Sequence, residues 1–172
     1  MFSGLTQDEI ESVNSLLGNA QKISKGDELY RSGMIGIITN GTATVSSANR
    51  TECKLAIVEI PETISDKDGN VYNVTAIANE CFGNGGAQGN QYIEELYIPS
   101  TIVSVGKQLA RGCSSLRKVV ISSQDTALLD GTFWSCSSLQ ELDMSGMENL
   151  TSIESIAVGA PVSSLKLPSS LR

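Results

Sequence analysis

The sequence Ile93-Glu-Glu-Leu-Tyr-Ile98 decides the fold, because its pattern of apolar residues returns three more times further along the chain. The later copies are Leu116-Arg-Lys-Val-Val-Ile121, Leu139-Gln-Glu-Leu-Asp-Met144 and Val162-Ser-Ser-Leu-Lys-Leu167, each 23 residues after the one before. The register extends outside these segments, because Cys113-Ser-Ser-Leu116 returns as Cys136-Ser-Ser-Leu139. A fixed period of this length indicates units that stack on one another, since one unit cannot bury its own apolar face.

One earlier unit is present but interrupted. Leu55-Ala-Ile-Val-Glu-Ile60 precedes the matching segment at Ile93 by 38 residues rather than 23, and insertions at 65–71 and 83–91 supply the excess. In the first insertion, Asp66-Lys-Asp-Gly-Asn70 looks like half of a calcium loop but lacks the bidentate acid that completes one, so we expect a hairpin turn. The second contains four glycines and no phosphate-binding pattern, which favours a flexible insertion.

The apolar positions of each unit predict one short strand with one buried side, because alternate residues of a strand point to opposite faces of a sheet. Stacked units place these strands side by side in a parallel sheet, about 4.8 Å apart. We therefore expect parallel strands at 55–60, 93–98, 116–121, 139–144 and 162–167. The middle inward positions, which we expect to be buried, are Leu96, Val119, Leu142 and Leu165.

Several motifs resemble the BspA-like leucine-rich repeats over roughly residues 40–172. They are Ile98-Pro-Ser-Thr-Ile-Val-Ser-Val-Gly106, the repeated Cys-Ser-Ser-Leu, and the small–aromatic pairs Cys81-Phe82 and Thr132-Phe133. Leu109-Ala110 and Ser155-Ile156 depart from that pairing. The resemblance implies a solenoid with a parallel concave sheet and irregular or short 3₁₀ convex segments. It also implies a surface or secreted protein of gut or oral bacteria such as Bacteroides, with a role in adhesion or host-protein binding.

The first third of the chain has a different pattern. Thr6 followed by Glu9 is a capping box before an apolar stripe, and it predicts a short helix that ends at Gly18-Asn19. Asn40-Gly41 between two apolar segments predicts a β-hairpin. We therefore expect residues 1–50 to form a helix and hairpin cap on an array at 51–172 whose last repeat is truncated.

The opening Phe2-Ser-Gly-Leu-Thr-Gln-Asp-Glu-Ile10 is also similar to that of cyclic-nucleotide-binding domains. The phosphate-binding cassette of that family, with its Glu and Arg, is missing from this chain. The matching part, about 45 residues, is too short for the barrel of that family, and short motifs of this kind are often misleading. A nucleotide site is therefore not expected.

The composition argues against catalysis and against a metal site. The chain has no histidine, which excludes Ser-His-Asp and Cys-His catalysis and removes the commonest general base. Ser-x-x-Lys occurs at Ser104, Ser115 and Ser163, but its companion motifs are absent. The four cysteines include no Cys-x-x-Cys pair, and we expect buried free thiols at Cys113 and Cys136. The prediction is a protein without enzymatic activity, metal or cofactor.

Charge and hydropathy limit the partners. A net charge of −7 and a pI of about 4.6 do not suit a nucleic-acid partner, which is bound mainly through its phosphates. No apolar stretch is long enough for direct membrane insertion, and the start does not resemble a signal peptide. Two locations are open: the cytoplasm, or the cell surface or exterior with a signal outside these residues. The chain stops at 167–172, partway through a unit, so we expect a piece of a longer repeat protein.

The predicted function is a module that binds a protein or glycan ligand, including ligands of a host exterior, and the alternative is a spacer that presents another domain. The outward side chains form two predicted rows, the first containing an alternating series of charges. The first row is Glu95, Lys118, Glu141 and Ser164, and the second is Tyr97, Val120, Asp143 and Lys166. Apart from Ser164, these residues are the predicted ligand contacts; the insertion at 83–91 is the next candidate.

Overall fold

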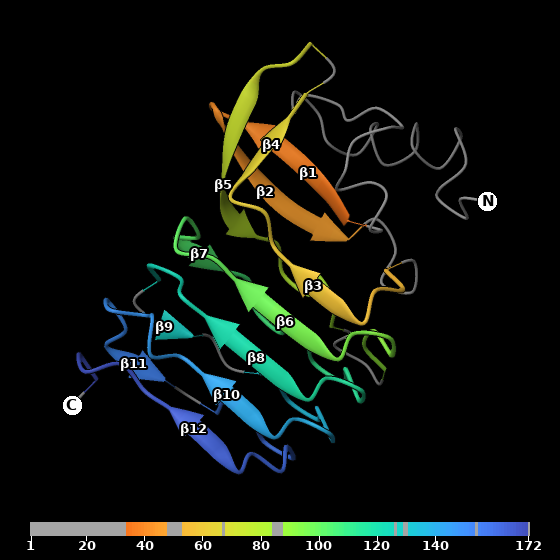
Figure 1. Ribbon diagram of the computed structural model, residues 1–172, viewed down its shortest axis with the longest axis vertical. Helices are drawn as coiled ribbons and strands as arrows, with labels where there is room; N and C mark the ends of the chain where they lie inside the picture. Colours follow the sequence, from red (N-terminus) through yellow and green to blue (C-terminus); the bar gives the residue numbers. More distant parts are fainter. Residues whose placement is uncertain are drawn as a thin grey trace.

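The computed structural model describes residues 34–47, 53–66, 68–83, 88–125, 127–128, 131–153 and 155–171 (Figure 1). The secondary structure in this part of the chain consists of strands. It includes no helix, and therefore no helix that could span a membrane. The strands are β1 (Met34–Thr39), β2 (Thr42–Ser47), β3 (Ile57–Glu59), β4 (Thr63–Ser65), β5 (Val71–Ile77), β6 (Glu95–Ile98), β7 (Ser104–Val105), β8 (Lys118–Ile121), β9 (Ala127–Leu128), β10 (Glu141–Asp143), β11 (Ser152–Ile153) and β12 (Ser164–Lys166).

The repeat builds a five-stranded sheet in the order β12-β10-β8-β6-β3, here called the repeat sheet. Every pairing in it is parallel, and Leu142 lies between Val119 and Leu165, its equivalents 23 residues away on either side. β3 pairs with β6 in the register that places Val58 beside Leu96, 38 residues on. The predicted parallel strands and their 23-residue register are confirmed. Each strand is shorter than its predicted segment, because the first residues of the segment lie in the turn that precedes it.

The core lies behind the repeat sheet and consists of the inward residues of successive units. Leu96, Val119 and Leu142 are almost completely inaccessible to solvent, as the alternation predicted. Phe82 and Phe133, the aromatic members of the small–aromatic pairs, are also fully buried. Short strands on the far side of the core are paired in parallel as well, β5 with β7 and β9 with β11. The repeat therefore packs its apolar residues between two sets of parallel strands.

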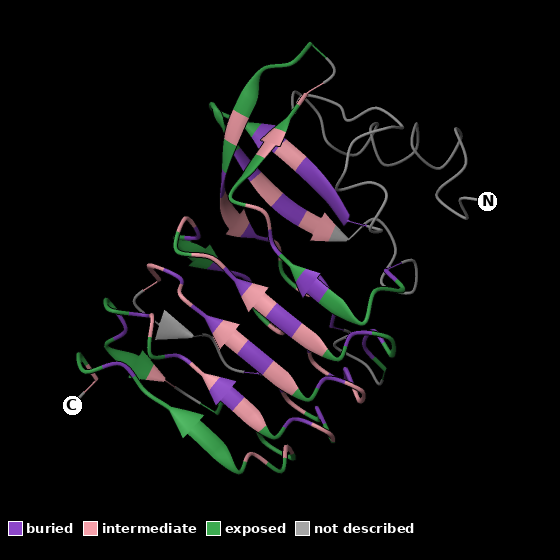
Figure 2. Cartoon of the chain, in the orientation of Figure 1, coloured by how far each residue is buried: buried purple, intermediate pink, exposed green. Residues whose placement is uncertain are grey.

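Leu165 contradicts the prediction that all four middle inward positions are buried. Its side chain is 52% exposed, whereas Leu142 one unit earlier is 1% exposed. The reason is that β12 lies at the edge of the repeat sheet, so the inner face of its unit is covered by β10 on one side only. Figure 2 shows this directly, since β12 is exposed along its length while β8 and β10 alternate.

The Asn40-Gly41 turn joins β1 and β2 in an antiparallel hairpin, as predicted. Both residues have positive φ angles, 53° and 81°, as the favoured two-residue hairpin turn requires. The hairpin continues into a second sheet, because β2 pairs in parallel with β5, which also pairs with β4 and β7. The predicted helix between Thr6 and Gly18 lies outside the described residues.

The Asp66 segment forms a turn between the antiparallel strands β4 and β5, as expected. One carboxylate oxygen of Asp66 accepts hydrogen bonds from the backbone N–H groups of Asp68 and Asn70, both at 2.9 Å, and the other accepts from the Asn70 side chain and the Tyr72 hydroxyl. These bonds lower the pKa of Asp66. The carboxylate therefore closes a turn.

All four cysteines are buried free thiols, which confirms the prediction for Cys113 and Cys136. The thiols of Cys113 and Cys136 each donate a hydrogen bond to a carbonyl oxygen of the preceding unit. Cys113 donates to Phe82 at 3.3 Å, and Cys136 donates to Ala110 at 3.1 Å. Burial raises the pKa of Cys136 to about 12, so the thiol stays protonated. These side chains pack as small apolar residues with one weak hydrogen bond each.

Candidate binding face

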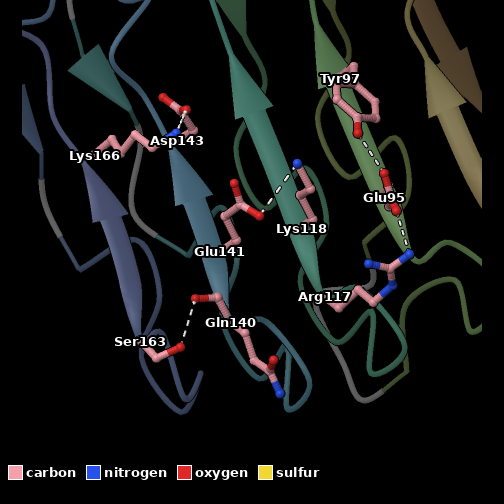
Figure 3. Close-up of polar contacts among 9 residues, drawn as sticks. All are labelled: Glu95, Tyr97, Arg117, Lys118, Gln140, Glu141, Asp143, Ser163 and Lys166. Atoms are coloured by element: carbon pink, nitrogen blue, oxygen red, sulfur yellow. Dashed lines mark hydrogen bonds and ion pairs between the residues drawn. The ribbon is translucent and has the colours of Figure 1, made fainter.

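The outward face of the repeat sheet holds all of the predicted contact residues. The register places them in two rows across the strands, and each row also includes one residue of β3. The first row is Ile57, Glu95, Lys118, Glu141 and Ser164, and the second is Glu59, Tyr97, Val120, Asp143 and Lys166. Figure 3 shows that the charged side chains lie above the strands and pair with neighbours on adjacent strands. We call this surface the outward face.

Tyr97 lies on β6, next to the edge strand β3 of the repeat sheet, and is held by a chain of polar contacts. Its hydroxyl donates to a carboxylate oxygen of Glu95 at 2.5 Å, and the other oxygen of Glu95 pairs with Arg117. The hydrogen bond from Tyr97, together with the positive charges of Arg117 and Lys118, lowers the pKa of Glu95. The same hydrogen bond raises the pKa of Tyr97. The aromatic side chain is therefore protonated and fixed in orientation at neutral pH.

Two further ion pairs join neighbouring strands of this face, one between β8 and β10 and one between β10 and β12. Lys118 pairs with Glu141 at 3.4 Å, and Lys166 with Asp143 at 2.7 Å. Asp143 also accepts hydrogen bonds from the hydroxyl and backbone N–H of Ser145. The bond from Lys166, followed by those from Ser145, lowers the pKa of Asp143 to about 2. The carboxylate is therefore charged above about pH 3, and protonation removes its stabilising contribution as the pH falls through that pKa.

The predicted alternating series of charges is only partly realised as ion pairs. The ion pair between Lys118 and Glu141 forms as the series predicts. Glu95, however, pairs with Arg117 instead of Lys118. Arg117 lies in the turn just before β8, and its guanidinium contacts both Glu95 and Glu94. The sequence contained a signal for this residue, because Arg117 follows Glu94 by one 23-residue period.

Apolar side chains accompany the charges at one end of the face. Tyr97 and Val120 are half-buried neighbours in the second row, and Ile57 on β3 is 53% exposed beside Glu95. Sequence reasoning missed Ile57 because the rows were started at the first uninterrupted unit. The result is a group of apolar side chains on β3, β6 and β8 that adjoins the ion pairs of Arg117 and Lys118.

The described residues of the glycine-rich insertion at 83–91 pack against neighbouring segments on both sides. A Cβ atom on Gly83 would lie 2.0 Å from the carbonyl oxygen of Gln108, so only glycine fits there. The buried side chain of Asn90 donates to the carbonyl oxygen of Cys53 at 2.6 Å and accepts from the N–H groups of Tyr92 and Ile93. Gly83 and Asn90 therefore have structural roles. Residues 84–87 lie outside the described residues.

The described part of the chain offers no group of three or more acidic, cysteine or histidine side chains placed to hold a metal ion. Three carboxylates of the outward face, those of Glu95, Glu141 and Asp143, are already engaged with cationic side chains.

Three solved structures share this fold. A leucine-rich repeat protein from Bacteroides ovatus has a TM-score of 0.63 and 25% identity, covering 81% of this chain and 35% of its own. Another, from Bacteroides capillosus, has a TM-score of 0.57 and 22% identity, covering 72% of this chain and 84% of its own. A leucine rich cell surface protein from Faecalibacterium prausnitzii has a TM-score of 0.53 and 16% identity, covering 88% of this chain and 49% of its own.

No curated protein matches the chain. The sequence pattern of the BspA type leucine rich repeat region, in contrast, matches residues 53–172 in six copies. This match includes the whole repeat sheet, and it begins close to the start of the unit that contains β3. The chain therefore belongs to the BspA-type leucine-rich repeat family.

Proposed function

We propose that the chain is a non-catalytic binding module that recognises a protein ligand through the outward face. The observation that carries this proposal is the environment of Tyr97, an aromatic side chain on the outward face whose hydroxyl bonds to Glu95, which in turn pairs with Arg117. Tyr and Arg are the residues most often found at interface hot spots. A pre-oriented side chain also loses less conformational entropy on binding than a mobile one.

The ion pairs of the outward face support the same function. Exposed ion pairs contribute little to stability, so the pairs at Lys118 and Lys166 are not needed to hold the sheet together. They do fix the positions of charged groups around Tyr97 and Val120. A polar border of this kind orients a partner and excludes others with the wrong charge.

The proposed setting is the surface or exterior of a bacterium, with the ligand a protein of the host exterior and adhesion as the result. Family membership supports this setting, as does the similar fold of the Faecalibacterium prausnitzii protein, which is described as a cell surface protein. The β1–β2 hairpin is proposed to act as a cap, because it adds to the β5 side of the second sheet, next to the first unit.

The test is a binding assay of the chain against purified mucins and matrix glycoproteins, each used intact and after enzymatic deglycosylation. We expect binding to survive deglycosylation and to be lost in the double variant Tyr97→Ala with Lys118→Glu, which removes the aromatic anchor and reverses one charge beside it. Loss of binding on deglycosylation would assign a glycan ligand instead. A double variant that folds and binds as well as the original chain would exclude the outward face and favour the spacer role.

A further inference from the structure

The charges of the outward face do not balance, since its two rows contain four carboxylates and two lysines. The two carboxylates on β10 each pair with a lysine, and those of Glu94 and Glu95 share Arg117. In the part of the chain that the structure describes, Glu59 on β3 makes no ion pair, and the residue is exposed. The excess negative charge of the face therefore lies at its β3 side.

Glu59 lies beside Tyr97, because β3 and β6 pair in a register that makes the two residues neighbours. Figure 3 shows the ring of Tyr97 above β6, with its hydroxyl directed along the strand toward Glu95. That hydrogen bond raises the pKa of Tyr97, and partial removal from water and the charges of three carboxylates, that of Glu59 among them, raise it further. The ring is therefore fixed in orientation and lies in a region of negative charge.

A cation from a partner meets two attractions at this position. The face of an aromatic ring attracts a cation through its quadrupole, and an adjacent carboxylate attracts it through its charge. The chain itself makes a contact of the first kind elsewhere, where the guanidinium of Arg111 lies 5.1 Å from the ring centroid of Trp134. Among the described residues no cation lies over Tyr97 in this way, and the nearby Arg117 is held by two glutamates. The ring is therefore available to a cation of a partner.

Ile57 makes the position more suitable for an arginine side chain than for a small cation. It lies two residues before Glu59 on the same face of β3 and is 53% exposed. The methylene groups of an arginine can pack on such a side chain while the guanidinium reaches the carboxylate. A planar guanidinium also stacks on an aromatic ring and bonds to a carboxylate through two N–H groups, a geometry that an ammonium group lacks.

We propose that the outward face binds a protein segment through an arginine of that segment, which stacks on Tyr97 and pairs with Glu59. The arginine contact rests on the proposed function, because it specifies the chemistry of the ligand for the same face. Both side chains point outward from the repeat sheet rather than along it, so a further repeat unit stacked on the sheet leaves them open. A basic segment also suits a chain with a net charge of −7.

The probe is an array of short randomised peptides, each made in three versions with arginine, citrulline or glutamate at its central position. Citrulline keeps the shape of arginine but has no charge. For the peptides that bind best, citrulline should weaken the affinity of the original chain about tenfold, the effect of losing one cation–aromatic contact with its ion pair. In Glu59→Gln the difference between the two versions should fall to about threefold, because the ring still attracts the cation.

Glu62→Gln is the matched control for Glu59→Gln. Glu62 is also exposed, but it lies in the segment between β3 and β4, outside the two rows of the outward face. The substitution removes the same charge from the chain, so a general effect of net charge would change both variants alike. We expect Glu62→Gln to distinguish arginine from citrulline as strongly as the original chain does.

Tyr97→Ala separates a failure of the arginine contact from a failure of the proposed function. If Tyr97→Ala abolishes peptide binding while the original chain binds the arginine and citrulline versions equally, the arginine contact is wrong and the outward face remains the binding surface. Equal discrimination by Glu59→Gln and Glu62→Gln, or arginine versions bound no better than glutamate versions, would also overturn the contact. If a folded Tyr97→Ala variant binds the arginine peptides as well as the original chain does, both proposals are overturned.

Discussion

Replacing Leu142 with alanine should lower the free energy of unfolding by about 2–5 kcal/mol. Leu142 is 1% exposed and lies between Val119 and Leu165 in the repeat sheet. Removing its side chain leaves a cavity in the interior of the array, where strands on both sides limit the collapse of the site. Denaturant unfolding monitored by circular dichroism measures this loss.

The control is the same substitution at Leu165, one period further along the chain. Because that side chain is 52% exposed, Leu165→Ala should cost much less than Leu142→Ala. Asp143→Ala, on the strand that contains Leu142, should also cost less than Leu142→Ala, because its side chain faces outward and the Lys166 end of its ion pair is exposed. If Leu165→Ala or Asp143→Ala costs as much as Leu142→Ala, the inward and outward faces have been assigned wrongly.

The second large effect is expected at Gly106. A Cβ atom there would lie 2.4 Å from the backbone carbon and oxygen of Ala78 and 2.5 Å from the nitrogen of Asn79. These are backbone atoms of the neighbouring unit, so the clash is relieved only if the two units move apart. Gly106→Ala should therefore cost roughly 3 kcal/mol, the upper part of the range for overpacked sites, measured by the same unfolding experiment.

Gly41→Asn is the control for Gly106→Ala. Gly41 has a positive φ of 81° and open space around its Cα, and asparagine adopts that conformation more readily than other residues with a side chain. The variant should unfold close to the original chain. A similar loss of stability in both variants would contradict the assignment of the effect at 106 to the close approach of two units.

The parts of the fold governed by the period could be predicted from the sequence. The 23-residue spacing determined which residues lie side by side, so the neighbours of Leu142 and the two outward rows were predicted correctly. In a repeat, residues at equivalent positions of successive units lie side by side, so the spacing alone identifies these contacts.

Features that break the period could not be predicted. The parallel pairing of β2 with β5 joins segments of unrelated sequence, and no spacing indicates which residues should meet. Leu165 is exposed because β12 is the edge strand of the repeat sheet. The pattern of apolar residues within one unit does not indicate whether that unit lies at an edge. On the outward face, Arg117 rather than Lys118 pairs with Glu95, because a long side chain in the preceding turn reaches over the strand.

The most direct test of ligand binding at the outward face compares two tyrosines in one affinity measurement. Tyr97 lies on the outward face, while Tyr92 is 49% exposed in the segment before β6. With a protein ligand identified by the binding assay, Tyr97→Ala should weaken affinity about 30-fold, the effect of losing a residue worth roughly 2 kcal/mol. Tyr92→Ala should leave the affinity unchanged. Equal affinities for the original chain and a folded Tyr97→Ala variant, or a larger loss at Tyr92, would contradict the assignment of the outward face as the binding surface.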